Sequence, residues 1–218
     1  EGKKLPLGFW EGATENHEIC EELLANLERR GLQLSKRVLW VTDGGGGIIK
    51  ALRERYGKKL VHQRWSVHKD RNIQRHLPRR YREQAHRLFT TALEQNSYKD
   101  AKKMLLELER WLRKINESAA DSLLEAFEEI LTLHRLKVPA LLRQSLHSTN
   151  PIKSMFSMVR DCEKNIKRYR HTKMRQRWLA AVLLQCEQRF NRVKGYKSIK
   201  PVLASIDASH EQEALKVA

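Results

Sequence analysis

Asp43 is the residue in this sequence whose position best suits metal chemistry. It follows the short apolar run 38–41 and precedes four consecutive glycines, residues 44–47. An aspartate that ends a buried strand lies at the carboxyl edge of a sheet, where the sites of α/β folds gather. A carboxylate there can bind Mg²⁺, which prefers oxygen ligands and pairs with phosphates. The alternative is that Asp43 only forms an Asx turn ahead of the glycines.

The glycine run itself does not indicate a nucleotide site. No Lys-Ser or Lys-Thr pair follows residues 44–47 at the spacing of a P-loop. The glycines better suit a tight turn from strand to helix with close backbone approach. Further along, His68 fits a hydrogen-bonded structural histidine better than a catalytic one. Trp65 and Trp178 are expected to be core aromatics, although tryptophan at a DNA site can stack on a base.

Positive charge is concentrated in two segments of the chain. The 218 residues have a formal net charge of +17, which favours a nucleic-acid partner because each neutralised phosphate releases counterions. Residues 64–87 and 160–178 each contain eight lysines and arginines against two acids, whereas residues 94–137 have a net charge of −1. Since a solvated helix face is not normally so one-signed, the pattern predicts two DNA-contacting surfaces around a neutral helical block. The candidate phosphate contacts are Arg64, Lys69, Arg71, Arg75, Arg160, Lys167, Arg168 and Arg170.

Cysteine usage and hydropathy exclude several other classes of protein. Cys20, Cys162 and Cys186 are widely spaced and odd in number, which argues against a disulfide framework. Without a CxxC pair, a structural zinc site is not expected either. No signal peptide is recognisable, and the apolar runs are too short to span a bilayer. We therefore expect a cytoplasmic protein with no membrane contact and no small-molecule substrate.

The elements that must position Asp43 follow an α/β pattern. Alternating strand and helix signals in the first part of the chain predict a parallel sheet; they fall at residues 5–10, 15–30, 37–42, 48–56 and 60–65. From residue 70 onward the apolar spacing is nearly all helical, with helices expected at 81–95, 98–116, 119–133, 151–160 and 173–193. The expected fold class is α/β, predominantly α by residue count.

Several short motifs, in their order along the chain, resemble those of the mutator-type transposases of bacterial insertion sequences. The likeness covers about residues 3–203, and so many separate motifs in one order make it specific. The motifs are Glu11-Gly12-Ala13-Thr14-Glu15-Asn16, Arg29-Arg30-Gly31-Leu32, Val41-Thr42-Asp43-Gly44, Gln63 to Asn72, His76-Leu77-Pro78, Ser148 to Arg160, Asn165 to Arg170, Met174 to Trp178 and Phe190 to Tyr196.

This resemblance implies an RNase H-like catalytic fold with a DDE triad of metal-binding carboxylates and a large all-helical insertion. Asp43 matches the second Asp of the triad, and position 153 matches the Glu, with the neutral helical block between them. His68 matches the histidine of the family's Cys-x-x-His signature. The implied parts are a partial RNase H-like region over 1–69, the insertion over 70–145, returning catalytic-domain helices over 146–200 and a tail over 201–218.

Three departures from the family pattern bear on activity. Position 153 is Lys where the family has Glu, position 65 is Trp where the signature has Cys, and the first Asp is expected ahead of residue 1. Lys153 puts an ammonium group where a metal ligand is expected, which removes coordination and repels Mg²⁺. Because two-metal phosphoryl transfer needs a constellation of carboxylates, this chain is expected to be unable to cut or join DNA.

The resemblance also sets the expected function and partners. An intact relative would transpose DNA by metal-dependent cleavage and strand transfer, with Mg²⁺ or Mn²⁺ as cofactor, DNA ends and target DNA as partners, and a homo-oligomer as the working form. The abrupt start at Glu1 suggests the C-terminal part of such a protein, truncated and impaired, and associated with the nucleoid. The alternative is a non-catalytic basic DNA-binding protein derived from a transposase. A basic structural protein with no role on DNA is a third possibility.

Overall fold

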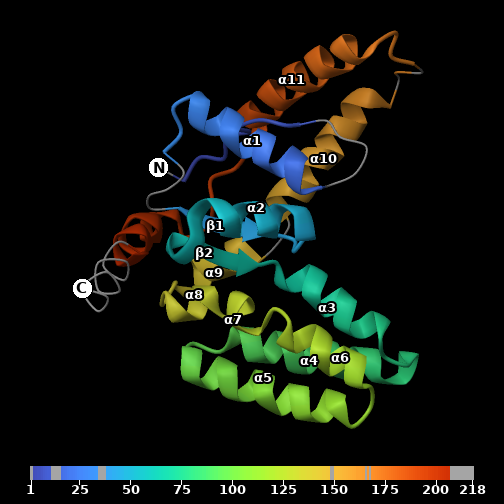
Figure 1. The fold of residues 1–218 in the computed structure, drawn as a ribbon, viewed down its shortest axis with the longest axis vertical. Helices are drawn as coiled ribbons and strands as arrows, with labels where there is room; N and C mark the ends of the chain where they lie inside the picture. Colours follow the sequence, from blue (N-terminus) through green and yellow to red (C-terminus); the bar gives the residue numbers. More distant parts are fainter. Residues whose placement is uncertain are drawn as a thin grey trace.

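The computed structural model describes residues 2–10, 16–33, 38–147, 150–164, 166 and 168–206, without the side chains of residues 150–153. Its elements in chain order are α1 (His17–Arg29), β1 (Leu39–Thr42), α2 (Gly46–Tyr56), η1 (Gly57–Lys59), β2 (Val61–Arg64), α3 (Ser66–Arg75), α4 (Arg79–Glu94), α5 (Tyr98–Arg113), α6 (Glu117–Leu124), α7 (Phe127–Ile130), α8 (Thr132–Arg135), α9 (Ala140–His147), α10 (Asn150–Glu163), α11 (Thr172–Arg189) and η2 (Tyr196–Ser198). The architecture is α/β and mostly helical. Figure 1 shows the small sheet in the middle, with α1 and α2 on one side and the block of α3 to α6 on the other.

The sheet consists of β1 and β2, which are parallel and joined by the crossover helix α2. Leu39 pairs with Val61 and Thr42 pairs with Arg64, so both strands end at the same edge. Helices α1 and α2 pack against each other through buried residues that include Leu24 and Leu52. The predicted order of strand, helix and strand around Asp43 is therefore confirmed.

The run at residues 5–10 is not a strand, which corrects the expectation from sequence. It lies on α1 through side-chain hydrogen bonds: Trp10 Nε1 donates to Glu22 at 2.7 Å, and Arg30 Nη1 donates to the carbonyl of Leu7 at 2.6 Å. Leu5 and Leu7 are 54% and 43% exposed. Since four of these six residues are exposed and the polar contacts come from helix side chains, the run does not pair with a strand of the sheet.

Side chains of β2 connect the sheet to the short helices α7 and α8. Gln63 is fully buried; its Nε2 donates to the carbonyl of Ile130 at 3.0 Å, and its Oε1 accepts from the backbone N–H of Leu133 at 3.0 Å. The hydroxyl of Thr132 donates to the carbonyl of His62 at 2.6 Å. The single helix expected at 119–133 is instead broken into α6, α7 and α8. The breaks leave free the backbone groups that Gln63 binds, which a continuous helix would use internally.

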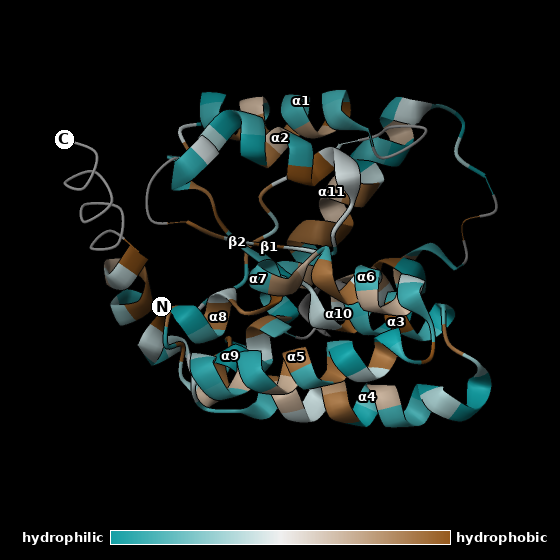
Figure 2. Cartoon of the chain, turned by 60° about the horizontal axis from the view of Figure 1, so that its bottom comes forward, coloured by the Kyte–Doolittle hydropathy of each residue, from teal (hydrophilic) through white to brown (hydrophobic). Residues whose placement is uncertain are grey.

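Helices α3 to α6 form the largest core of the molecule. Buried members of this core are spread over all four helices and include Ile73, Phe89, Leu105 and Leu123. Figure 2 shows hydrophilic and hydrophobic residues alternating along α4 and α5, as expected for helices with one face on a core. None of the helices in the described part of the chain is both long and apolar enough to cross a membrane.

The substitution Thr132→Val tests the connection between β2 and α8. Thr132 is 1% exposed, and valine matches its shape but cannot donate to the carbonyl of His62. We expect the free energy of unfolding to fall by about 1 to 2 kcal/mol, because a buried carbonyl loses its hydrogen bond. Urea unfolding followed by circular dichroism measures the change. Thr91→Val, at an exposed site on α4, is the matched control; an equal change in both variants would contradict the expectation.

Candidate functional site

Asp43 lies at the carboxyl edge of the sheet, directly after β1. Its side chain is exposed, and its Oδ1 accepts a hydrogen bond from the backbone N–H of Gly45 at 3.2 Å. Gly44 has φ of +98°, a conformation that glycine adopts without strain. Asp43 thus forms the Asx turn that the sequence allows, while the carboxylate stays open to solvent at the edge where α/β sites gather.

The guanidinium group of Arg64 holds the turn that carries Asp43. Arg64 Nη1 donates to the carbonyl of Gly44 at 2.9 Å. A Cβ atom at position 44 would lie 2.0 Å from the same Nη1 atom, so no larger residue fits while Arg64 stays in place. Arg64 in turn is 6% exposed and bonds Glu125 at 2.5 Å and Glu129 at 3.0 Å. The turn is therefore fixed through Arg64 to the carboxylates that follow α6.

Arg64 and Lys69 are internal cations, which corrects their expected role as phosphate contacts. Lys69 is 4% exposed, and its ammonium group contacts Glu125 and donates to the carbonyl of Ser122 at 2.8 Å. Buried cations with carboxylate partners cannot reach a DNA backbone without breaking those pairs. Their positions in a basic segment gave no sign of this, since the acidic partners come from a distant part of the chain.

The carboxylates near Asp43 are already used by cations. Burial alone would raise the pKa of Glu129, but contacts with His62, Arg53 and Arg64 outweigh it and lower this pKa to about 2. The pKa of Glu125 is also lowered: burial opposes the shift, and the nearby Lys69 and Arg64 produce it. In the described part of the chain, no group of three His, Cys, Asp or Glu side chains is arranged to hold a metal.

The end of α9 contacts the residues that follow β2 at this edge of the sheet. The backbone N–H of Trp65 donates to the carbonyl of Thr42 at 2.8 Å, which continues the hydrogen bonding between the strands one residue beyond β2. The next residue, Ser66, donates through its hydroxyl to the carbonyl of His147 at 3.4 Å. Three residues beyond His147 comes the start of α10, where Lys153 lies in the first turns. The Lys153 side chain falls outside the described part.

The two positions of the Cys-x-x-His signature are adjacent in space. The rings of Trp65 and His68 stack with centroids 5.6 Å apart and planes within 10°. Both side chains are half-buried at the start of α3. Trp65 therefore lies beside His68 and, being half-buried, is only partly a core residue.

The other basic candidates are exposed wherever the structure describes them; they are Arg71, Arg75, Arg160, Arg168 and Arg170. Lys167 lies outside the described residues. Figure 1 shows α10 and α11 side by side, with the connection between them at the outer end of the molecule. Trp178 on α11 is 39% exposed and lines a groove with Arg177, which corrects its expected place in a core. The second basic segment is thus a projecting surface with an aromatic ring.

Comparison with known proteins identifies one family. The model of the family described as "Transposase, Mutator family" matches residues 1–193. The match includes Asp43, the basic side chains on α3 and α10, and the whole helical block. No curated protein matches the chain.

Proposed function

Because this chain belongs to the mutator family of transposases, we propose that it binds DNA through two basic surfaces and is impaired in catalysis at position 153. The observation that supports DNA binding most directly is the exposure of the cations on α3 and along α10 and α11. Phosphate contacts from such side chains position a protein on a duplex without reading its sequence. DNA is the partner that this charge distribution fits.

The first surface consists of Arg71 and Arg75 on α3. These residues are four apart on one helix, and both are exposed. The second surface consists of Arg160 on α10 and of Arg168 and Arg170 in the connection to α11. We include Lys167 in the second surface from its sequence position alone. Each surface offers cations to a polyanion without a change in the buried ion pairs.

A metal ion is the family's implied cofactor, and the residues here fit it poorly. Asp43 offers one exposed carboxylate, while Glu125 and Glu129 are held by cations. Two metal ions that clamp the attacking and leaving oxygens need several carboxylates. Lys153 replaces the Glu that the family pattern supplies, and its charge opposes a divalent cation. We therefore derive no reaction step through a metal in this chain.

Two functional outcomes follow for the whole protein. In the first, the chain is part of a transposase whose cleavage and strand transfer are weakened by Lys153. In the second, which Lys153 favours, it is a non-catalytic DNA-binding protein derived from a transposase. A homo-oligomer stays a prediction in both cases.

A strand-transfer assay with Mg²⁺ or Mn²⁺ separates the two. The assay compares the original residue Lys153 with the substitution Lys153→Glu, each in a version of the protein that also carries the first Asp of the triad ahead of residue 1. Activity with Lys153 that Lys153→Glu raises and Asp43→Asn abolishes supports the first outcome, whereas activity that appears only with Lys153→Glu supports the second. If both versions bind DNA and neither joins it, the enzymatic assignment is overturned.

The salt dependence of DNA binding tests the second basic surface. We expect the logarithm of the affinity to fall steeply with the logarithm of salt concentration, by about 0.9 per phosphate contact. The double variant Arg168→Gln/Arg170→Gln is expected to reduce this slope by about 2. Fluorescence anisotropy with a labelled duplex measures it.

The matched control for this experiment is Lys103→Gln/Arg110→Gln, which removes two exposed cations from the neutral helical block. It is expected to leave the slope within error of the unchanged chain. Equal slopes for the two double variants would show that Arg168 and Arg170 do not contact phosphate.

A further inference from the structure

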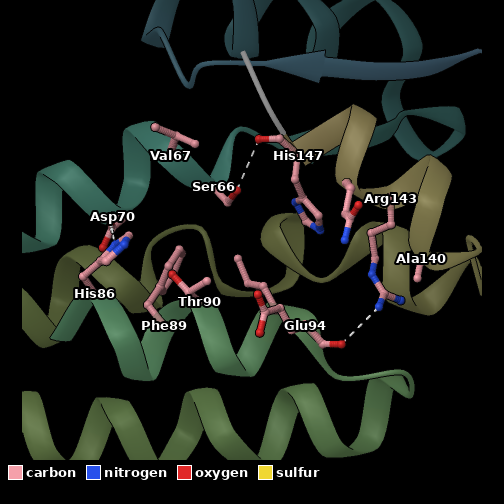
Figure 3. A pocket seen from close by; sticks show the side chains of 12 residues that line it. Ser66, Val67, Asp70, His86, Phe89, Thr90, Glu94, Ala140, Arg143 and His147 are labelled. Carbon is pink, nitrogen blue, oxygen red and sulfur yellow. Dashed lines mark hydrogen bonds and ion pairs between the residues drawn. The ribbon is translucent and has the colours of Figure 1, made fainter. Parts of the chain in front are cut away.

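A cavity of about 520 Å³ lies between α3, α4 and α9, next to the edge of the sheet that carries Asp43. Its volume is in the range of small-molecule sites, about 300 to 1,000 Å³. Figure 3 shows Asp70 and His86 at one end, Arg143 at the other, and Phe89 and Thr90 between them. The two ends have opposite chemistry, which restricts the ligands that fit.

Arg143 supplies a buried cation at one end. It is 5% exposed, and its Nη2 donates to the carbonyl of Gln95 at 2.8 Å, which caps the C-terminus of α4. Among the described residues, no carboxylate forms an ion pair with this guanidinium group. Both of its hydrogen bonds there come from Nη2. Glu94 lines the cavity at its exposed rim without forming an ion pair with Arg143. A buried charge of this kind is stabilised when an anion binds beside it.

His147 supplies neutral hydrogen-bonding groups next to Arg143. Both of its ring nitrogens are buried, and neither has a partner among the described residues. Burial, together with the nearby His134 and Arg143, lowers the pKa of His147 to about 3. At neutral pH the ring is therefore uncharged, with one N–H donor and one acceptor that lack partners in the described part of the chain.

Asp70 supplies an acceptor at the opposite end. Its Oδ2 accepts hydrogen bonds from His86 Nδ1 at 2.7 Å and from Gln74 Nε2 at 2.8 Å. Its Oδ1 is buried and lacks a partner in the described part of the chain. A buried carboxylate oxygen without a hydrogen bond is costly, so this atom favours a ligand that brings an N–H or O–H donor.

We infer that this cavity binds a single nucleotide unit, with its phosphate at Arg143 and His147 and its base between Phe89 and Asp70. The wall between the two ends is largely apolar and includes Val67 and Leu93, which suits the flat face of a base. A free amino acid with an uncharged side chain does not fit, because its carboxylate and ammonium groups lie on one carbon and cannot reach both ends. The choice of a nucleotide as the ligand rests on the DNA-binding role proposed above. The description of the charged and polar ends of the cavity is independent of that role.

Isothermal titration calorimetry with deoxyadenosine monophosphate tests the site on the chain as it is. Arg143→Gln keeps a donor for the carbonyl of Gln95 but removes the charge, and we expect a loss of affinity of roughly tenfold to a hundredfold. Thr90→Leu fills the cavity without removing a charged group and is expected to weaken binding by at least about tenfold. The control is Arg135→Gln, an exposed arginine on α8 outside the cavity. Thermal unfolding of each variant verifies that it is folded.

The outcomes separate the site from the rest of the proposed function. The inference is supported if both cavity variants weaken nucleotide binding and Arg135→Gln leaves it unchanged. This result does not depend on DNA binding by the basic surfaces, so it stands even if Arg168→Gln/Arg170→Gln abolishes DNA binding. If a duplex with one unpaired adenosine competes with deoxyadenosine monophosphate for the cavity, the natural ligand is a nucleotide of DNA. If the duplex does not compete, the ligand is a free nucleotide. The inference is overturned if none of the four deoxynucleoside monophosphates binds at millimolar concentration. It is also overturned if inorganic phosphate binds equally well, or if folded Thr90→Leu binds unchanged.

Discussion

Lys153→Glu is expected to increase the affinity of the chain for Mn²⁺ by about tenfold to a hundredfold. The last residue of α9, His147, accepts a hydrogen bond from Ser66, which follows β2 at the sheet edge that carries Asp43, and α10 begins three residues later; we therefore expect position 153 to lie near this edge. The substitution removes a positive charge and adds a carboxylate, so both changes favour a divalent cation. Electron paramagnetic resonance of free Mn²⁺ measures the affinity without any requirement for activity.

Three further variants separate coordination from net charge. Lys153→Gln removes only the positive charge and is expected to give a small part of the gain. Lys164→Glu makes the same change in net charge at an exposed position beyond α10 and is expected to give little. Asp43→Asn in the Lys153→Glu background is expected to cancel the gain. If Lys164→Glu increases the affinity for Mn²⁺ as much as Lys153→Glu does, positions 43 and 153 do not form a common metal site.

Glu129→Gln is expected to lower the free energy of unfolding at pH 7 by about 3 kcal/mol. The carboxylate of Glu129 is 19% exposed and lies 3.0 Å from Arg64 and 2.7 Å from Arg53. Its removal leaves the buried guanidinium group of Arg64 with only the more exposed Glu125 as an ionic partner. Glu107→Gln, at an exposed site on α5, is the control, with an expected change within about 0.5 kcal/mol.

The same variant is expected to show a specific dependence on pH. The pKa of Glu129 is about 2 in the folded chain and 4.5 as the ordinary value. Since the folded pKa is the lower one, the stabilisation is present above pH 4.5 and is lost as the pH falls from 4.5 towards 2. Urea unfolding at intervals across this range should show the difference between the original chain and Glu129→Gln closing towards zero. A difference that stays constant would show that the charge of Glu129 is not its cause.

The part of the fold around Asp43 could be predicted from local sequence. A short apolar run, four glycines and a helical pattern determine β1, the turn and α2 because each signal lies within a few residues of the next. The helical character after residue 70 is just as local, since it depends on apolar spacing along each helix. The carboxyl-edge position of Asp43 follows from these signals alone.

The roles of Arg64 and Lys69 could not be predicted in this way. Both lie in a segment with a net charge of +6, which correctly indicates basic surface for Arg71 and Arg75. Whether a cation is solvated or buried depends on its partner, and Glu125 lies 61 residues from Arg64 in the sequence. The breaks between α6, α7 and α8 have a similar cause, because Gln63 binds the backbone groups there. A charge count or a helical period contains no information on such contacts.

The cavity at Arg143 has no sequence signature for the same reason. Its walls come from three helices, and its polar groups are Asp70 on α3 and, more than 70 residues later, Arg143 and His147 on α9. Each of them alone has an ordinary structural interpretation. Only their placement around one volume, with atoms that lack partners, distinguishes the site.

The pairing of Arg64 and Lys69 with Glu125 also has a consequence for how this protein can change over generations. A deletion that removed α5 to α7, and with them Glu125 and Glu129, would leave Arg64 and Lys69 as buried cations without carboxylate partners, and the arginine that holds the turn at Gly44 would lose its ion pairs. The block is therefore not an accessory that a descendant can discard and still keep a stable sheet. Lineages that shed it would first have to replace both cations, so the helices and the strands are expected to be inherited together.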